Sequence, residues 1–294
     1  MLYRISNYKG KHMTNQSRRE FLKLAGLAVA AGSLPVAAVA ANSGSETLSP
    51  KTIPFDLGMA SYTFRKFTLD QALEMTKQLD LKKITLKDMH LPMNTTASEM
   101  AVVQKKMSDA GIELSSCGVV YMKTAEEVHK AFAYARLAGI KMMVGVPEQS
   151  LLGLAEEKVK ETDISLAIHN HGPTDQRFPS PESAYSLIKN MDKRMGLCID
   201  VGHTQRLGLD PADQVKLYFD RLLDVHIKDV SSADAKGTTV EIGKGVIDTI
   251  KLLKTLVDLK YTGTLHLEYE KDQDNPMPGV IYSIGYLRGA LGSI

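Results

Sequence analysis

The sequence predicts a closed (β/α)8 barrel, the TIM-barrel fold, as a single domain over residues 56–294. Short runs of β-branched or aliphatic residues recur with starts about 30 residues apart, the length of a strand plus a crossover helix. Eight such runs fit into roughly 240 residues, which is the strand count and the size of this fold. The alternative is a doubly wound open sheet, which often has a glycine-rich first turn, whereas the first turn here contains no glycine.

The elements follow in order from these runs and from helix-capping residues. Thr68 and Thr124 each begin an amphipathic stretch in a capping-box-like pattern, and Gly111 and Gly139 close helices before strands. Between residues 147 and 163 we expect only a brief helix, because this segment is shorter than the others. The eight expected strands are Leu57–Ser61, Lys83–Leu86, Ile112–Gly118, Lys141–Val146, Ser165–His169, Met195–Ile199, Asp224–Ile227 and Thr264–Leu267.

Residues 1–41 are predicted to be an export signal, and residues 42–55 a linker. The pair Arg18-Arg19, followed by Phe-Leu-Lys, precedes an apolar run of small residues that ends in Ala-Val-Ala. This order is typical of a secretory signal, and the paired arginines resemble a twin-arginine signal, which implies the periplasm. A transmembrane helix is the alternative, less favoured because the run is short and contains glycine and proline. No cysteine follows the run, so we expect no stable membrane anchor.

The charge and the cysteine content exclude some classes of partner and cofactor. The chain has 36 basic and 34 acidic residues, a net charge of +2. Residues 1–41 hold six of the basic residues and one acidic residue, which leaves 30 and 33, a net charge of −3. We therefore expect no nucleic-acid partner. Two cysteines, Cys117 and Cys198, cannot form a thiolate-rich metal site, and we expect both to be buried free thiols.

Polar side chains gather where the expected strands end. Because the carboxyl ends of barrel strands meet at one face, a histidine of strand five should converge with Asp200, His226 and Glu268. Two imidazoles and two carboxylates suit Mn²⁺, Co²⁺, Zn²⁺, Ni²⁺ or Fe²⁺ without selecting among them. We therefore expect one divalent metal ion. His266, two residues before Glu268 on the same strand face, is expected to pack in a deeper layer.

These motifs resemble the xylose isomerase-like TIM-barrel superfamily. This is the sugar phosphate isomerase/epimerase group, which includes tagatose 3-epimerase-like enzymes, inosose dehydratases and keto-glycoside lyases. The resemblance covers residues 57–294. It is carried by Ala60–Arg65, Leu86–Pro92, His169–Gly172, Asp200 with His203, His226–Asp229, Gly243–Gly245 and Glu268.

The resemblance implies roles for individual residues. It implies that Asp200, His226 and Glu268 bind metal. It further implies that His203 contacts a substrate hydroxyl and that Lys228 steadies developing oxyanion charge.

Further residues at the strand ends are expected to bind the sugar. Tyr62, Arg65, Lys87 and His90 are expected to line its pocket, with packing at the rim as the alternative for the first two. Glu148, after strand four, either supplies a further carboxylate to the substrate or is an exposed acid near a helix N-terminus.

One position departs from the pattern of the group's epimerases. Those enzymes have a glutamate at the end of strand five, where this chain has His169 and then His171. The resemblance implies that, in the epimerases, two metal-bound glutamates exchange protons with the two faces of the substrate carbon. Glu268 is the one of these that is retained here. It is therefore expected to act in catalysis as well as in metal binding. If His169 is the ligand, His171 becomes the general base, with an unperturbed pKa of about 6.5. The two histidines could also exchange these roles.

One base and a metal ion suffice for elimination. The sequence thus predicts a periplasmic, metal-dependent 3-keto-glycoside 1,2-lyase acting on a small keto-sugar or keto-glycoside. A keto-sugar isomerase or epimerase and a non-catalytic carbohydrate-binding barrel are the alternatives, and a homo-oligomer is possible. A DNA-repair endonuclease is disfavoured by export and charge. The loop Gly243-Lys244-Gly245 could cradle a phosphate or only shape a turn.

Overall fold

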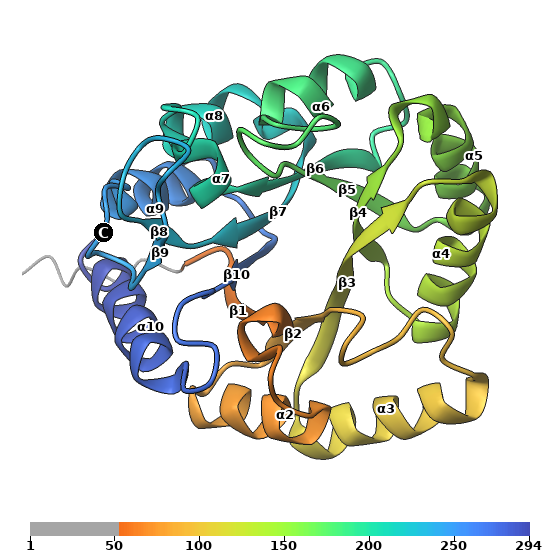
Figure 1. Ribbon diagram of the computed structural model, residues 1–294, viewed down its shortest axis with the longest axis horizontal. Helices are drawn as coiled ribbons and strands as arrows, with labels where there is room; N and C mark the ends of the chain where they lie inside the picture. The colour runs from red at the N-terminus through yellow and green to blue at the C-terminus, as the bar shows by residue number, and fades with distance from the viewer. Residues whose placement is uncertain (1–52) are drawn as a thin grey trace, which may run out of the picture. The chain divides into compact units, whose positions relative to one another are not determined.

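Eight parallel strands close into a barrel in the computed structural model, which describes residues 53–294 (Figure 1). The order around the barrel is β1-β10-β7-β6-β5-β4-β3-β2, so the predicted TIM barrel is confirmed. The predicted signal and most of the linker lie outside the described residues. The barrel strands are β1 Asp56–Ala60, β2 Lys83–Leu86, β3 Glu113–Met122, β4 Met142–Pro147, β5 Ser165–His169, β6 Met195–Asp200, β7 Leu222–Ile227 and β10 Thr264–Leu267.

Helices surround the barrel and connect successive strands (Figure 1). Thr68 and Thr124 form capping boxes at the starts of α2 and α4, and Gly111 and Gly139 end α3 and α4 in the left-handed conformation, as predicted. The α-helices are α2 Leu69–Gln78, α3 Ala97–Ala110, α4 Ala125–Ala138, α5 Leu152–Thr162, α6 Pro181–Ile188, α7 Val201–Gln205, α8 Pro211–Leu217, α9 Thr249–Asp258 and α10 Met277–Leu291. Short 3-10 helices are η1 Ser61–Phe64, η2 Gln149–Leu151 and η3 Phe219–Arg221.

The prediction of a brief helix after the fourth strand is wrong. Helix α5 has 11 residues and is preceded by the single turn η2. The connection from β4 is so short that almost the whole segment remains for helix, and Asp163, at φ 57°, ends it. Each barrel strand therefore has a full covering helix or helix pair.

Strand β3 is longer than predicted. The expected strand ended at Gly118, but the observed one continues through Val119 and Tyr121 to Met122. The pairing of β3 with β4 shifts register between Cys117 and Val120, which lets the strand resume after the glycine. This extension carries the Tyr121 side chain to the mouth of the barrel.

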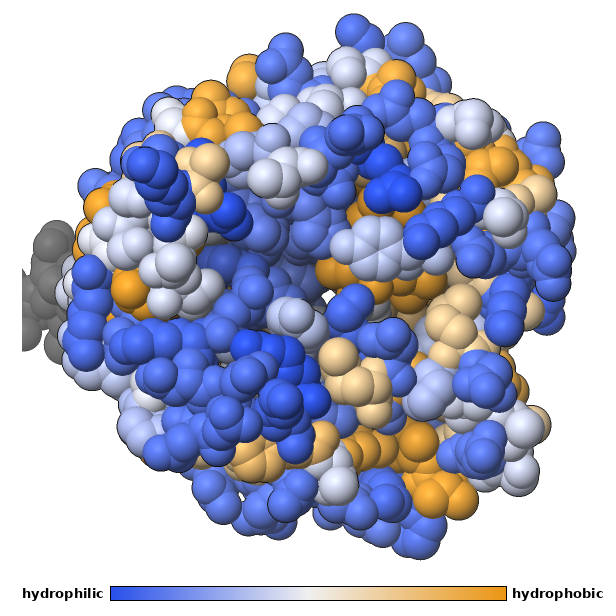
Figure 2. All heavy atoms as spheres, viewed as in Figure 1, coloured by the Kyte–Doolittle hydropathy of each residue, from blue (hydrophilic) through white to orange (hydrophobic). Residues whose placement is uncertain are grey.

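Two further features shape the mouth. A short antiparallel hairpin, β8 Asp229–Val230 with β9 Thr239–Val240, follows β7 and was not predicted. Figure 2 shows a hollow in the middle of the ring that is lined mainly by hydrophilic residues. No helix within residues 53–294 combines the length and the apolar character needed to cross a membrane.

Candidate metal centre and active site

Four neighbouring strands bring two histidines and two carboxylates together at the barrel mouth. His169 ends β5, Asp200 ends β6, His226 lies near the end of β7, and Glu268 directly follows β10. The strand pairing holds Asp200 level with His226. All four residues are at least nine-tenths buried, and one ligand atom from each lies within 4.8 Å of the others. We call this set the mouth layer.

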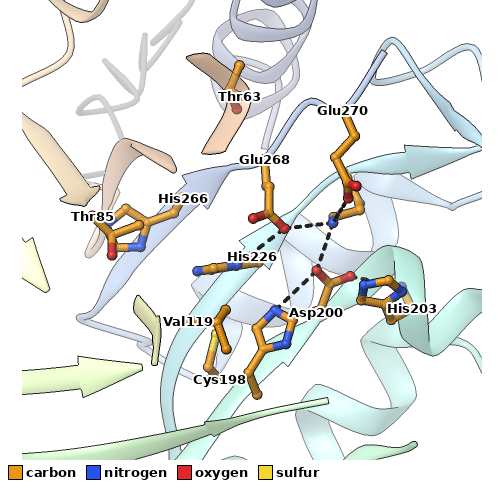
Figure 3. Close-up of polar contacts among 12 residues, drawn as sticks. Thr63, Thr85, Val119, Cys198, Asp200, His203, His226, His266, Glu268 and Glu270 are labelled. Carbon is orange, nitrogen blue, oxygen red and sulfur yellow. Dashed lines mark hydrogen bonds and ion pairs between the residues drawn. The ribbon is translucent and has the colours of Figure 1, made fainter. Parts of the chain in front are cut away.

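The geometry of the mouth layer fits a divalent cation. His169 Nε2 lies 3.4 Å from Asp200 Oδ2, and His226 Nδ1 lies 3.5 Å from Glu268 Oε2 (Figure 3). Ligand atoms that share a tetrahedral ion at about 2.1 Å are themselves about 3.4 Å apart. Both ring nitrogens of His169 and of His226 lack hydrogen-bond partners, and Asp200 Oδ2 has only ion-pair contacts. Buried polar atoms rarely stay unpaired, so their convergence gives these residues the donor set that a divalent ion requires.

The charge of the site also favours a cation. Lys228 is 3% exposed, and its Nζ donates to Glu268 Oε2 at 2.7 Å and to Glu270 Oε1 at 2.5 Å, and lies 3.0 Å from Asp200 Oδ2 (Figure 3). One ammonium thus faces three carboxylates, which leaves excess negative charge. Lys228 donates hydrogen bonds to two carboxylates and forms an ion pair with a third, so these groups hold its ammonium in place.

Electrostatics keep these groups charged. Burial alone would raise the pKa of Asp200 and of Glu268, but Lys228 outweighs it and holds both values well below their ordinary range. Burial would lower the pKa of Lys228, but the three carboxylates raise it well above its usual value. For His226 as well, burial opposes the charged form, and Glu268 chiefly outweighs it and raises the pKa. The site therefore stabilises positive charge at its centre.

A second set of polar residues lies deeper in the barrel, with Asp224 and His266 two residues before His226 and Glu268 on their strands. His266 Nδ1 lies 2.9 Å from Asp224 Oδ1, and His266 Nε2 lies 2.7 Å from Ser115 Oγ. We call Ser115, Asp224 and His266 the lower layer. The other oxygen of Asp224 lies 3.7 Å from His226 Nε2, the ring nitrogen turned away from Glu268. Asp224 therefore stands where a carboxylate orients a metal-binding histidine.

His171 lies against the mouth layer. Its ring centroid is 4.4 Å from that of His169 and 5.5 Å from that of His203. Its Nε2 lies 3.1 Å from the hydroxyl of Tyr121, and its Nδ1 lies 3.8 Å from Asp175 Oδ2. Burial, with a further contribution from His169, lowers the pKa of His171 to about 4, below the unperturbed value expected from sequence. The ring is therefore neutral at neutral pH and able to accept a proton.

The turn after β6 holds Asp200 in place. Asp200 Oδ1 accepts the backbone N–H of His203 at 2.8 Å and caps α7. The backbone N–H of Asp200 donates to Asn170 Oδ1 at 3.0 Å, which ties the end of β6 to that of β5. A side chain at Gly202 would collide with Lys228, because a Cβ there would lie 2.4 Å from its Cγ. Glycine is thus needed for the buried lysine to reach the carboxylates.

The remaining predicted substrate residues follow the ends of strands β1, β2 and β4. Arg65 lies over the Tyr62 ring at 4.8 Å and donates to the backbone oxygen of Glu270 at 2.8 Å. Lys87 donates to the backbone oxygen of Val119 at 2.9 Å.

His90 and Glu148 have partners apart from the mouth layer. His90 is 5% exposed, and its Nε2 lies 3.0 Å from the backbone oxygen of Phe67. Glu148 Oε1 accepts from Arg177 Nε at 2.6 Å, at the edge of a separate surface hollow.

The glycine loop is occupied by the protein itself. Asp229 Oδ2 accepts the backbone N–H groups of Gly243 at 2.9 Å and Gly245 at 3.0 Å. Its Oδ1 accepts that of Ile247 at 3.2 Å. A phosphate would have to displace this buried carboxylate, so the loop shapes a turn instead.

A cavity of about 440 Å³ adjoins the mouth layer. Its size falls within the range of small-molecule sites, about 300–1,000 Å³. Its wall is formed by the start of α7, the β8–β9 hairpin and the segment after β10. Among its lining residues are His203, Arg206, Lys228, Thr239 and Glu270.

Sequence reasoning did not single out Tyr121, Asp175 or Asp224 as site residues. Tyr121 was missed because the third strand was expected to end at Gly118. Asp224 has a visible signal, since it lies two residues before His226 and so shares its strand face. Asp175 lies in the loop after β5, where strand periodicity gives no information.

Comparison with known proteins places the chain in a family. The family model described as "Xylose isomerase-like TIM barrel" matches residues 68–290. The chain belongs to this family. Members of this xylose isomerase-like family are enzymes, and the structural neighbours include isomerases, epimerases and a dehydratase.

Individual relatives and solved structures show how much of the chain is similar to known proteins. The chain is 28% identical over 145 residues to a rhizopine catabolism protein of Rhizobium meliloti, which covers 44% of each chain. It is 26% identical over 147 residues to an inosose dehydratase of Geobacillus kaustophilus, covering 45% of this chain and 46% of that one. It thus matches a little under half the length of these curated relatives. A 3-keto-D-glucoside 4-epimerase from E. coli shares the fold, with a TM-score of 0.66 and 14% identity over 80% of this chain and 99% of that chain.

Proposed function

We propose that this protein is a divalent-metal-dependent lyase that removes the proton next to the ketone of a keto-glycoside and expels the glycosidic oxygen. The observation that carries the proposal is the mouth layer with its unpaired ligand atoms, next to a neutral imidazole, His171, that lies outside the ligand set. The predicted export signal makes the periplasm the proposed location.

The mouth layer would hold the ion through His169, Asp200, His226 and Glu268. When bound, a divalent ion would polarise the ketone as a Lewis acid. Lys228 keeps the carboxylates of Asp200 and Glu268 ionised and in place, and the buried ring of His169 stays neutral because its pKa is lowered to about 4. Neutral imidazoles and ionised carboxylates are the forms in which these groups bind metals.

His171 is the base in this proposal. Its Nε2 lies 3.1 Å from the Tyr121 hydroxyl, and it can accept a proton from carbon when that hydroxyl turns to the substrate. His203 and the adjoining cavity would hold the sugar hydroxyls. An inosose is a cyclic keto-polyol, and a dehydratase removes water from it by elimination, so the inosose dehydratase supports the same type of reaction here.

An isomerase or epimerase is the second candidate. An isomerase, which moves a proton between neighbouring carbons, could use His171 alone, but an epimerase moves a proton between two faces of one carbon and needs a second base across the substrate. Glu148 was the sequence candidate for a further carboxylate, but its side chain is paired with Arg177. Elimination needs a single base, which His171 provides.

The experiment uses purified protein loaded separately with Mn²⁺, Co²⁺, Zn²⁺, Ni²⁺ and Fe²⁺. Each form is incubated with a 3-keto-glycoside of 4-nitrophenol in deuterated buffer. The lyase releases nitrophenol, and the His171→Ala variant releases at least about 100-fold less. Deuterium at the carbon next to the ketone without release would indicate the isomerase or epimerase. Intact, unlabelled substrate with every metal would contradict both.

A further inference from the structure

Tyr121 lies beside the base but belongs to a different part of the barrel. It stands near the end of β3, opposite Val146 of β4, and reaches across the end of β4 to His171. The two rings stack at 5.7 Å with 20° between their planes, and the phenol oxygen lies 3.1 Å from His171 Nε2. Tyr121 is 41% exposed, so a molecule in the mouth can touch it.

The surroundings of His171 favour one direction for this hydrogen bond. The other ring nitrogen, Nδ1, has no hydrogen-bond partner but lies 3.8 Å from Asp175 Oδ2, and a nearby carboxylate favours the proton on the nitrogen that faces it. Asp175 is held by the backbone N–H groups of Arg177 and Phe178, which donate to its Oδ1 at 2.7 and 2.8 Å. In the tautomer that Asp175 favours, Nε2 is the acceptor and the Tyr121 hydroxyl is the donor.

Loss of an alkoxide from a glycoside needs an acid as well as a base, because an unprotonated sugar or alkyl oxide is a poor leaving group. We propose that Tyr121 is the catalytic acid that protonates the departing glycosidic oxygen and that His171 restores its proton. This inference rests on the proposed lyase activity. It is carried by the side chain of a residue that is 41% exposed and whose hydroxyl is hydrogen-bonded to the atom that takes the substrate proton.

The protons balance over one turnover. When substrate is bound, the Tyr121 hydroxyl turns from His171 Nε2 to the glycosidic oxygen, which frees the single lone pair of Nε2. The C–H bond next to the ketone breaks, its proton goes to His171 Nε2, and its electron pair forms a carbon–carbon double bond. The C–O bond to the leaving group breaks, its pair goes to the oxygen, and the Tyr121 proton joins that oxygen. His171 then returns a proton to the phenolate across the 3.1 Å contact. Burial, with a smaller contribution from Asp175, raises the pKa of Tyr121, which keeps the phenol protonated beforehand.

A comparison of leaving groups tests this assignment in the metal-loaded, full-length protein. Two 3-keto-glucosides are used, one carrying 4-nitrophenol, which leaves as a stable anion, and one carrying methanol, which needs a proton. For Tyr121→Phe we expect methanol release to fall by about 100-fold or more and nitrophenol release by less than about fivefold. Metal content and deuterium exchange next to the ketone stay at the parent level. Tyr282→Phe, which removes an exposed hydroxyl from α10, is the matched control and matches the parent with both substrates.

The other outcomes separate two kinds of failure. Equal losses with both leaving groups, or no loss with either, would overturn the role of Tyr121 while the lyase stands. Loss of metal from Tyr121→Phe would show a structural role and overturn it too. A parent protein that releases neither leaving group would overturn the proposed lyase activity and, with it, the role of Tyr121 as the catalytic acid.

Discussion

The mouth layer and the lower layer both contain histidine and carboxylate side chains, but only in the lower layer does each ring nitrogen of the histidine have a partner. In the lower layer, both ring nitrogens of His266 have partners at hydrogen-bond distance, Asp224 and Ser115. In the mouth layer, both ring nitrogens of His169 and His226 have none. The histidines and carboxylates of both layers are at least nine-tenths buried, so burial cannot explain the difference.

This difference distinguishes a layer that supports the structure from a layer suited to bind an ion. A buried histidine with both nitrogens paired costs little, whereas unpaired buried groups each cost about 1–3 kcal/mol. Both ring nitrogens of His169 and of His226 carry this cost at the carboxyl ends of the strands, where TIM-barrel enzymes place their chemistry. Asp224 links the two layers, because one oxygen meets His266 and the other faces His226.

Removing a mouth-layer carboxylate should have the largest effect. Glu268→Gln keeps the shape but removes the charge, and we expect metal affinity to fall by more than about 100-fold and activity to fall with it. Metal affinity is measured by competition with a fluorescent chelator, and His226→Ala should behave in the same way. Unchanged metal affinity in both variants would place the ion elsewhere.

Removing the base should separate chemistry from metal binding. His171→Ala should keep the ion but lose about 10²–10⁴-fold in turnover, the usual range for an acid–base residue. Metal content and turnover are measured on the same sample. If the variant releases its metal instead, His171 is the ligand and His169 is the base.

Breaking the link between the layers should have an intermediate effect. Asp224→Asn leaves the ring of His226 without its facing carboxylate, and we expect metal affinity to fall by about 10–100-fold. The measurement is the same chelator competition, with circular dichroism as the check on folding. An affinity equal to that of the parent would show that Asp224 supports only His266.

A change confined to the lower layer should have the smallest effect. Ser115→Ala removes the partner of His266 Nε2, and we expect the free energy of unfolding to fall by about 1 kcal/mol. Denaturant unfolding measures it, and the metal affinity should stay within about twofold of the parent. A large loss of metal would show that the layers are not separate.

The sequence predicts the fold well because strand and helix periods differ and cap residues mark the helix ends. Three of the eight strands, those beginning at Lys83, Ser165 and Thr264, have the expected bounds. The clustering of Asp200, His226 and Glu268 follows from their positions at strand ends. The depth of His266 follows from side-chain alternation, which places it two residues below Glu268.

Other features depend on contacts that no local pattern contains. The reach of Tyr121 to His171 needs β3 to continue past a glycine, and the engagement of Lys228 by three carboxylates needs side chains from β6 and from the end of β10. The lowered pKa of His171 comes mainly from burial, which depends on the packed loops. Which histidine nitrogens are paired is likewise a property of the assembled barrel.

The central claim is that the mouth layer binds one divalent ion, and metal analysis tests it most directly. The parent, Ser115→Ala and Glu268→Gln are each incubated with the five candidate metals, dialysed, and analysed by inductively coupled plasma mass spectrometry. With at least one metal, we expect about one ion per chain in the parent and in Ser115→Ala, and less than about a tenth of that in Glu268→Gln. No retained ion in the parent with any metal, or equal content in Glu268→Gln, would contradict the claim.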